Sequence, residues 1–90
     1  MTVYRLSIPK PVIKRIEALP GRYRQRVWRL IQSLAAEPRP AGAKKLRERE
    51  SMYRIALDDY RIVYSIEDDL LLIEVVKVGT KEGPEFYQDV

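Results

Sequence analysis

The stretch MYRIALDDYRIVYSIEDDLLLIEVVKVG, residues 52–79, decides the fold of this chain. Apolar and polar residues alternate along its first half, which is the pattern of strands with one buried face. The segment Leu70–Val78 is almost continuously apolar, as expected for a central strand covered on both faces. Two aspartate pairs, Asp58-Asp59 and Asp68-Asp69, separate the three runs and are typical turn residues. The stretch therefore predicts three consecutive antiparallel strands joined by two acidic turns.

A two-residue turn at Asp58-Asp59 sets the register of the first predicted hairpin. In this register Ala56 faces Arg61 and Arg54 faces Val63. Arg54 and Arg61 then share one face of the sheet, which we call the arginine face, and lie diagonally adjacent. Two neighbouring arginines repel each other unless something anionic lies between them. The arginine face is therefore a candidate anion site.

The second turn leaves an alternative open for these arginines. With Asp68-Asp69 as a two-residue turn, Val63 pairs with Glu74. Glu74 then falls on the arginine face and can neutralise one of the two guanidinium groups in a cross-strand ion pair. The pattern of residues thus supports either an anion site or an internal ion pair.

The N-terminal half predicts a short strand followed by two helices. Residues 2–7 alternate as a strand, and Ser7 is the expected N-cap of a helix that begins near Pro9. Pro20-Gly21 breaks this helix, and a second helix is predicted over residues 22–36. Two helices joined by a tight corner form an αα-hairpin. The sequence therefore predicts an α+β fold, with this hairpin packed on a small antiparallel sheet of about four strands.

Composition limits the classes of function. Residues 1–90 are short enough to form a single domain. No apolar run approaches the roughly 20 residues of a membrane span, and the N-terminus lacks a signal-peptide pattern. The chain has no cysteine and no histidine, which fits a cytoplasmic location and removes the usual general base. The net charge of +4 indicates an anionic partner, either nucleic acid or an acidic protein segment.

Two further segments carry candidate residues. The connection before the central stretch holds four basic side chains: Lys44, Lys45, Arg47 and Arg49. The tail, residues 79–90, carries Lys81 and the pair Phe86-Tyr87, with a short helical turn expected around residues 85–88. We expect the tail to fold back and bring Lys81 and Tyr87 near the arginine face; a frayed end with Phe86 docked as a plug is the alternative. No phosphate-binding loop or metal-ligand motif is present, so no cofactor and no metal are expected.

The order of these elements resembles the RelE/ParE superfamily of type II toxin–antitoxin toxins, and most closely its RelE-like branch. Two motifs carry the resemblance: the hairpin YRI…YRIVY at residues 53–64, and V-x-V-G-x-K-E…Y at residues 76–87. The likeness covers essentially the whole chain. It implies a small antiparallel sheet with helices packed on it, and a toxin that inhibits translation by cleaving mRNA in the A site of the ribosome.

The resemblance also implies roles for individual residues. Arg54 and Arg61 would hold the phosphate while the 2′-hydroxyl attacks the adjacent phosphorus. Lys81 would act as a general acid or phosphate clamp, and Tyr87 would stack on a base or act as a base. The expected RNA-binding residues are Lys44, Lys45, Arg47 and Arg49. The implied partners are an acidic antitoxin that wraps the domain, the ribosome with its mRNA and rRNA, and operator DNA reached only through the antitoxin.

Two positions depart from the family pattern. RelE itself has a second lysine two residues after the position of Arg54, where this chain has Ala56, and Lys81 stands where arginine is usual. Two other functions therefore stay open: a ParE-like inhibitor of DNA gyrase without a nuclease site, and a toxin homologue whose remaining role is to bind an antitoxin and operator DNA. The basic cluster with Tyr87 favours the nuclease, and Ala56 favours the gyrase inhibitor.

Overall fold

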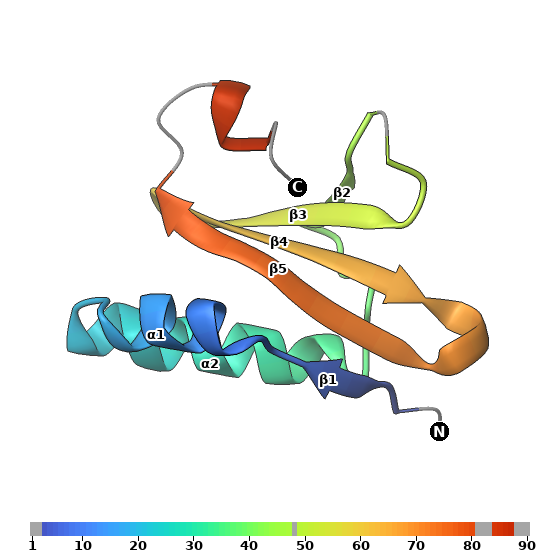
Figure 1. Ribbon diagram of the computed structural model, residues 1–90, viewed down its shortest axis with the longest axis horizontal. Helices are drawn as coiled ribbons and strands as arrows, with labels where there is room; N and C mark the ends of the chain where they lie inside the picture. The colour runs from blue at the N-terminus through green and yellow to red at the C-terminus, as the bar shows by residue number, and fades with distance from the viewer. Residues whose placement is uncertain (1–2, 48, 81–83, 88–90) are drawn as a thin grey trace.

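The computed structural model describes residues 3–47, 49–80 and 84–87. In chain order its elements are β1 (Arg5–Ser7), α1 (Lys10–Glu17), α2 (Gly21–Leu34), β2 (Lys44–Lys45), β3 (Met52–Leu57), β4 (Tyr60–Glu67), the 3₁₀ turn η1 (Asp68–Leu70), β5 (Leu72–Thr80) and the 3₁₀ turn η2 (Pro84–Tyr87). Figure 1 shows both helices on one face of the sheet and η2 on the other. The fold is α+β, as predicted.

Within the described residues the sheet has five strands, in the order β1-β5-β4-β3-β2. The sequence predicted about four strands and missed β2, whose two residues pair with β3. So short a strand offers no alternation for a sequence pattern to detect. The sheet is antiparallel except at one edge, where β1 runs parallel to β5. This edge can be parallel because the αα-hairpin and three further strands separate β1 from β5 along the chain.

The two helices form the predicted αα-hairpin, with Pro20 as the N-cap of α2. The N-cap of α1 is Pro9, and the prediction of Ser7 for this role is wrong. The extended backbone of Pro9 turns its carbonyl into the helix, where it accepts from the N–H groups of Val12 and Ile13. Ser7 is instead the last residue of β1 and pairs with Glu74. Neither of the described helices is long and apolar enough to cross a membrane.

The core lies between the helices and the face of the sheet opposite the arginines. Its fully buried side chains come from both helices and two central strands: Ile16, Val27, Ile31, Leu34, Ile62, Tyr64, Ile73 and Val75. Burying one such side chain stabilises a fold by about 1.5–3 kcal/mol. The Tyr64 hydroxyl donates to the carbonyl of Pro38 at 2.8 Å, which ties the loop after α2 to the sheet. The helical layer therefore packs against the side of the sheet opposite the one that carries the arginines.

The register of the first hairpin is the predicted one. Leu57 pairs with Tyr60, Ala56 with Arg61, and residue 54 with residue 63. Asp58 has a φ of 54°, the positive value that tight two-residue hairpin turns require. Arg54 and Arg61 therefore share one face, and the sequence-based prediction of the arginine face is confirmed.

The predicted register of the second hairpin is wrong. The chain turns through η1 and then Leu71, which has a φ of 50°, so the connection is longer than two residues. A bulge between Val63 and Tyr64 shifts the pairing again. As a result Val63 pairs with Lys77, while Glu74 pairs with Ser65.

This register removes the internal ion pair as an explanation of the arginine face. Glu74 is exposed and, among the residues that the structure describes, it forms no ion pair with Arg54 or Arg61. Its cross-strand partner on β4 is Ser65, which is two positions beyond Val63, the partner of Arg54. The two guanidinium groups are therefore left without the carboxylate that the sequence had suggested.

Candidate active site on the arginine face

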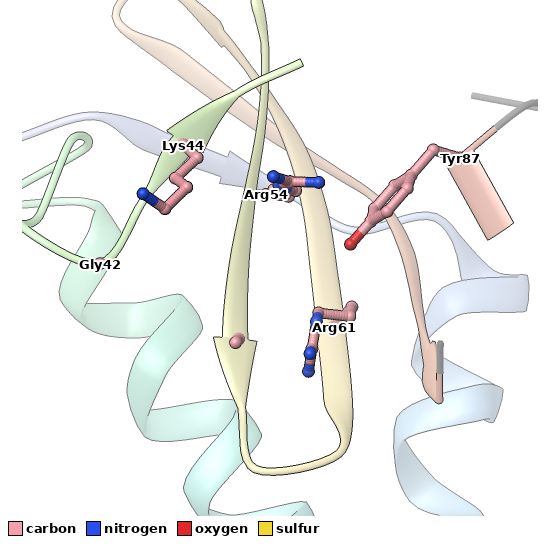
Figure 2. A pocket seen from close by; sticks show the side chains of 6 residues that line it. Gly42, Lys44, Arg54, Arg61 and Tyr87 are labelled. Carbon is pink, nitrogen blue, oxygen red and sulfur yellow. The ribbon is translucent and has the colours of Figure 1, made fainter. Parts of the chain in front are cut away.

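The arginine face holds a pocket of about 220 Å³. It is lined by Gly42, Lys44, Arg54, Ala56, Arg61 and Tyr87. Figure 2 shows the two arginines on neighbouring strands, with the Tyr87 hydroxyl directed toward the space between them. Among the residues that the structure describes, three cations and no carboxylate line this pocket, so its potential is positive and suits an anion.

Strands β3 and β4 set the spacing of the arginines. Arg54 lies opposite Val63, and Arg61 lies opposite Ala56, so the two arginines are diagonal neighbours. Such neighbours have backbones about 7–8 Å apart, close enough for both guanidinium groups to reach one phosphate. Ala56 contributes only a methyl group, which leaves the centre of the pocket open.

Two backbone carbonyls hold the Arg61 side chain. Its Nη1 donates to the carbonyl of Asp58 at 2.8 Å and to the carbonyl of Tyr60 at 2.9 Å. Its other N–H groups donate to no residue in the described part of the chain, so they can bind a ligand. The Asp58 carboxylate does not neutralise the site, because it accepts from Arg26 of α2 at 2.9 Å. This hydrogen bond lowers the pKa of Asp58 below its ordinary value.

The turn η2 places Tyr87 over the sheet. Phe86, only 8% exposed, packs in a small cluster with Leu46 and Val63 on the arginine face. Lys77 donates to the Phe86 carbonyl at 2.7 Å. The Tyr87 ring meets the Phe86 ring edge-on, with centroids 5.1 Å apart. The prediction that the tail folds back beside the arginine face is confirmed for Tyr87, and Phe86 docks as a plug.

Gly79 leaves room for this docking. It lies directly opposite Arg61, and a Cβ at this position would be 3.3 Å from Cε1 of Phe86 and 3.2 Å from Nη2 of Arg15. Contacts that short would force the neighbours to move by a few tenths of an ångström. Arg15 is a cation that the sequence did not assign to this region. No sequence spacing indicates that a side chain of α1 reaches this end of β5.

The structure separates the basic residues that were predicted to bind RNA. Lys44 lines the pocket, because β2 pairs it with Arg54. Lys45 pairs with Tyr53, and alternation along the strand turns its side chain toward the opposite face. Arg47 and Arg49 are exposed in the connection to β3 and do not line the pocket. Of the four residues predicted to be catalytic, three line it, and Lys81 lies outside the described residues.

Comparisons with known proteins place this geometry in context. A family model described as the ParE toxin of a type II toxin–antitoxin system, parDE, matches residues 7–83. The chain is 28% identical over 88 residues to the mRNA interferase toxin RelE of Escherichia coli K12, covering 96% of this chain and 92% of that protein.

Solved structures are similar over nearly the same length. A mutant of E. coli toxin RelE in the free state aligns with a TM-score of 0.79 and 28% identity, covering 97% of this chain and 93% of that one. A chain of the archaeal RelE–RelB complex from Pyrococcus horikoshii aligns with a TM-score of 0.80 and 29% identity, covering 90% and 98%. The likeness therefore includes the strands that carry the pocket.

Proposed function

We propose that this chain, which belongs to the ParE toxin family of type II toxin–antitoxin systems, is an endoribonuclease that cleaves mRNA in the A site of the ribosome. The observation that carries the proposal is the convergence of Arg54, Arg61 and Tyr87 on one pocket whose lining, in the described part of the chain, holds no carboxylate. The similarity to a protein named mRNA interferase toxin supports the same reaction class.

Cleavage through the 2′-hydroxyl needs little more than this set of groups. The 2′-hydroxyl loses its proton, its oxygen bonds to phosphorus, the bond from phosphorus to O5′ breaks, and O5′ takes up a proton. The products are a 2′,3′-cyclic phosphate and a 5′-hydroxyl end. Negative charge develops on the non-bridging oxygens, where Arg54 and Arg61 donate. One preorganised donor of this kind contributes about 10²–10³ in rate.

The anchoring of Arg61 supports its role as such a donor. With Nη1 held by two carbonyls, the guanidinium is already oriented before substrate binds, and less freedom is lost on forming the complex. The Tyr87 hydroxyl, directed toward the same space, is positioned to hold or accept the 2′-proton. For Lys81 we propose, on its place in the sequence motif alone, that it clamps the phosphate or protonates O5′.

Beyond contacts to the phosphate and the 2′-hydroxyl, the described residues of the pocket do little to orient a nucleotide. It is small and lies on an open sheet face, and among the described residues Tyr87 is its only aromatic wall. Proper orientation of reacting groups can contribute as much as about 7–11 kcal/mol to a reaction of this type. We infer that the ribosome, through mRNA and rRNA, supplies this orientation. This contribution explains how a chain that has no histidine as a general base can act as a nuclease.

We further propose that a cognate antitoxin inhibits the toxin by wrapping this basic domain with an acidic segment. The net charge of +4 supports an acidic partner, and the similar P. horikoshii chain was solved in a RelE–RelB complex. Operator DNA would be reached only through the antitoxin.

A second candidate function is inhibition of DNA gyrase. The matching family model bears the ParE name, and Ala56 removes a side chain from the middle of the pocket. This function needs no convergence of Arg61 and Tyr87 on a phosphate, so substitutions in the pocket separate the two candidates.

The test is to express the toxin and map mRNA ends on translating ribosomes, with a gyrase supercoiling assay in parallel. We expect cleavage in phase with codons, and loss of at least 10² in rate for Arg61→Ala. The matched control is Arg29→Ala, which removes an exposed arginine from α2 on the other side of the sheet and should cut normally. Intact mRNA together with blocked supercoiling would overturn the proposed nuclease function and support inhibition of DNA gyrase.

A further inference from the structure

We propose that Lys44 is a third phosphate-binding cation of the pocket and occupies, from β2, the space that Ala56 leaves empty on β3. This inference rests on the proposed nuclease function. It changes the role of Lys44 from general RNA binding to direct contact with the non-bridging oxygens of the reacting phosphate.

The strand pairing brings Lys44 to this space. Lys44 lies directly opposite Arg54, and side chains at such positions have Cβ atoms about 4.5–5.5 Å apart. Ala56 is the next residue of β3 on the same face, so it is the diagonal neighbour of Lys44 and the direct neighbour of Arg61. Lys44 and Arg61 therefore flank Ala56 from opposite sides. Only a methyl group stands between them.

Lys44 is also available for a ligand. It is exposed, and in the described chain no hydrogen bond or ion pair holds its ammonium group. Figure 2 shows its side chain along the pocket wall, extended toward Gly42. Its four-carbon stem rotates easily, so an anion between the arginines can draw the ammonium group over Ala56. A larger side chain at position 56 would obstruct that movement.

The remaining basic residues of this segment cannot take the same role. The Lys45 side chain points to the opposite face, and Arg47 and Arg49 do not line the pocket. They can attract RNA from a distance, which lowers KM without a specific effect on the chemical step. A cation that touches the reacting phosphate instead stabilises charge that grows in the transition state, so its loss lowers kcat. Lys44 transfers no proton in this scheme.

The experiment measures single-turnover cleavage of mRNA on programmed ribosomes by the wild-type protein, Lys44→Gln, Lys45→Gln and the control Lys10→Gln. Lys10 lies at the start of α1, and its substitution removes one charge from the helical side of the sheet. We expect Lys44→Gln to lower the rate at saturation by roughly 10- to 100-fold, less than a preorganised donor because the side chain is flexible. Lys45→Gln should change only the concentration dependence, and Lys10→Gln neither quantity.

A second variant tests the vacant space directly. Ala56→Lys in the Lys44→Gln background should restore at least part of the lost rate, since it returns an ammonium group to the same place from the adjacent strand. A rescued double variant also shows that Lys44→Gln had not simply misfolded. A Lys44→Gln rate equal to wild type would overturn the inference and leave the nuclease function intact.

Phosphate binding separates this inference from the proposed function. Titration of the isolated protein with inorganic phosphate, followed by NMR, should shift the signals of Lys44 and Arg61, and the affinity should fall at least several-fold in Lys44→Gln but not in Lys10→Gln. If the wild-type protein does not cleave mRNA but shows this binding pattern, the nuclease function fails and Lys44 remains part of an anion site. Equal phosphate affinity in the three proteins contradicts the inference whatever the cleavage result.

Discussion

The guanidinium of Arg54 lies 5.3 Å from the centre of the Tyr87 ring, so strand β3 and the turn η2 meet inside the pocket. A cation over an aromatic face is attracted by about 0.5–1 kcal/mol at an exposed site. The contact orients both side chains at once. It also makes the geometry of the site depend on a turn near the chain end, which is anchored by Phe86 and not by the helical core.

Tyr87→Phe is expected to lower the rate of cleavage by about 10²-fold or more, the typical contribution of a positioned proton-transfer group. The ring and its contact with Arg54 remain in this variant, so RNA affinity should stay close to that of the wild type. Single-turnover rates and equilibrium binding on the same ribosomal complex provide the measurement. A Tyr87→Phe protein that cleaves at the normal rate would show that the ring, and not the hydroxyl, does the work of this residue.

Phe86→Ala is expected to reduce activity as strongly as Tyr87→Ala, although its side chain does not line the pocket. Without the Phe86 plug the turn can leave the sheet by local unfolding, taking Tyr87 with it. Because the helical core is untouched, the melting temperature should fall much less than for a core Phe→Ala change, which costs about 3–5 kcal/mol.

A double-variant cycle checks this dependence. If Phe86 acts only by placing Tyr87, the rate of the protein carrying both substitutions should equal that of Tyr87→Ala alone. Additive losses would mean that Phe86 contributes to catalysis by another route. Val3→Ala, at an exposed position in the part of the chain before β1, serves as the control for truncating an apolar side chain.

The first hairpin could be predicted from sequence because a single local rule determines it. A two-residue turn at Asp58-Asp59 places Arg54 and Arg61 on one face, and the structure has this turn. The same rule failed at Asp68-Asp69, where the chain continues into η1 and Leu71 takes a positive φ. Leucine rarely adopts that conformation, and nothing in its neighbours indicates it. Two identical aspartate pairs thus belong to two different connections.

The part of the site contributed by β2 could not be predicted for a different reason. Lys44 and Lys45 are adjacent and chemically equal, and only the pairing of β2 with β3 turns one of them into the pocket. This pairing is a tertiary contact made by a strand too short to have a pattern of its own. The sequence could therefore assign a basic character to the segment, but not identify which lysine lines the pocket.

The decrease in the free energy of unfolding at acidic pH should depend on Asp68. Its carboxylate accepts from Arg39 at 2.8 Å and from the Tyr4 hydroxyl at 2.6 Å, and the Arg39 hydrogen bond in particular lowers its pKa below the ordinary value. A carboxyl group with a lowered folded-state pKa stabilises the fold above its unfolded-state pKa and loses that contribution as the pH falls. Asp68→Asn should therefore lose less stability than the wild type below about pH 4.

Thermal melts between neutral and strongly acidic pH test this difference. Asp69→Asn is the matched control, because Asp69 forms no ion pair among the described residues. It should reproduce the acid slope of the wild type. Cleavage activity at neutral pH should be unchanged in both variants, since η1 does not line the pocket. If the stability of Asp68→Asn falls with decreasing pH as steeply as that of the wild type, Asp68 is not the group responsible for the acid sensitivity.

The alkaline limb should depend on Tyr64, which is fully buried and donates to the Pro38 carbonyl. Burial raises the pKa of Tyr64 to about 12, above the ordinary value of 10.0. A raised folded-state pKa means that the stabilising contribution is complete below the unfolded-state pKa and is lost as the pH rises through the folded-state value.

Tyr64→Phe should cost about 1–3 kcal/mol at neutral pH, because the buried carbonyl loses its donor. Urea titrations should show that this difference shrinks steadily above about pH 10, where only the wild-type unfolded chain gains from ionising this tyrosine. Parallel pH profiles for the two proteins would mean that Tyr64 is not protected in the folded state.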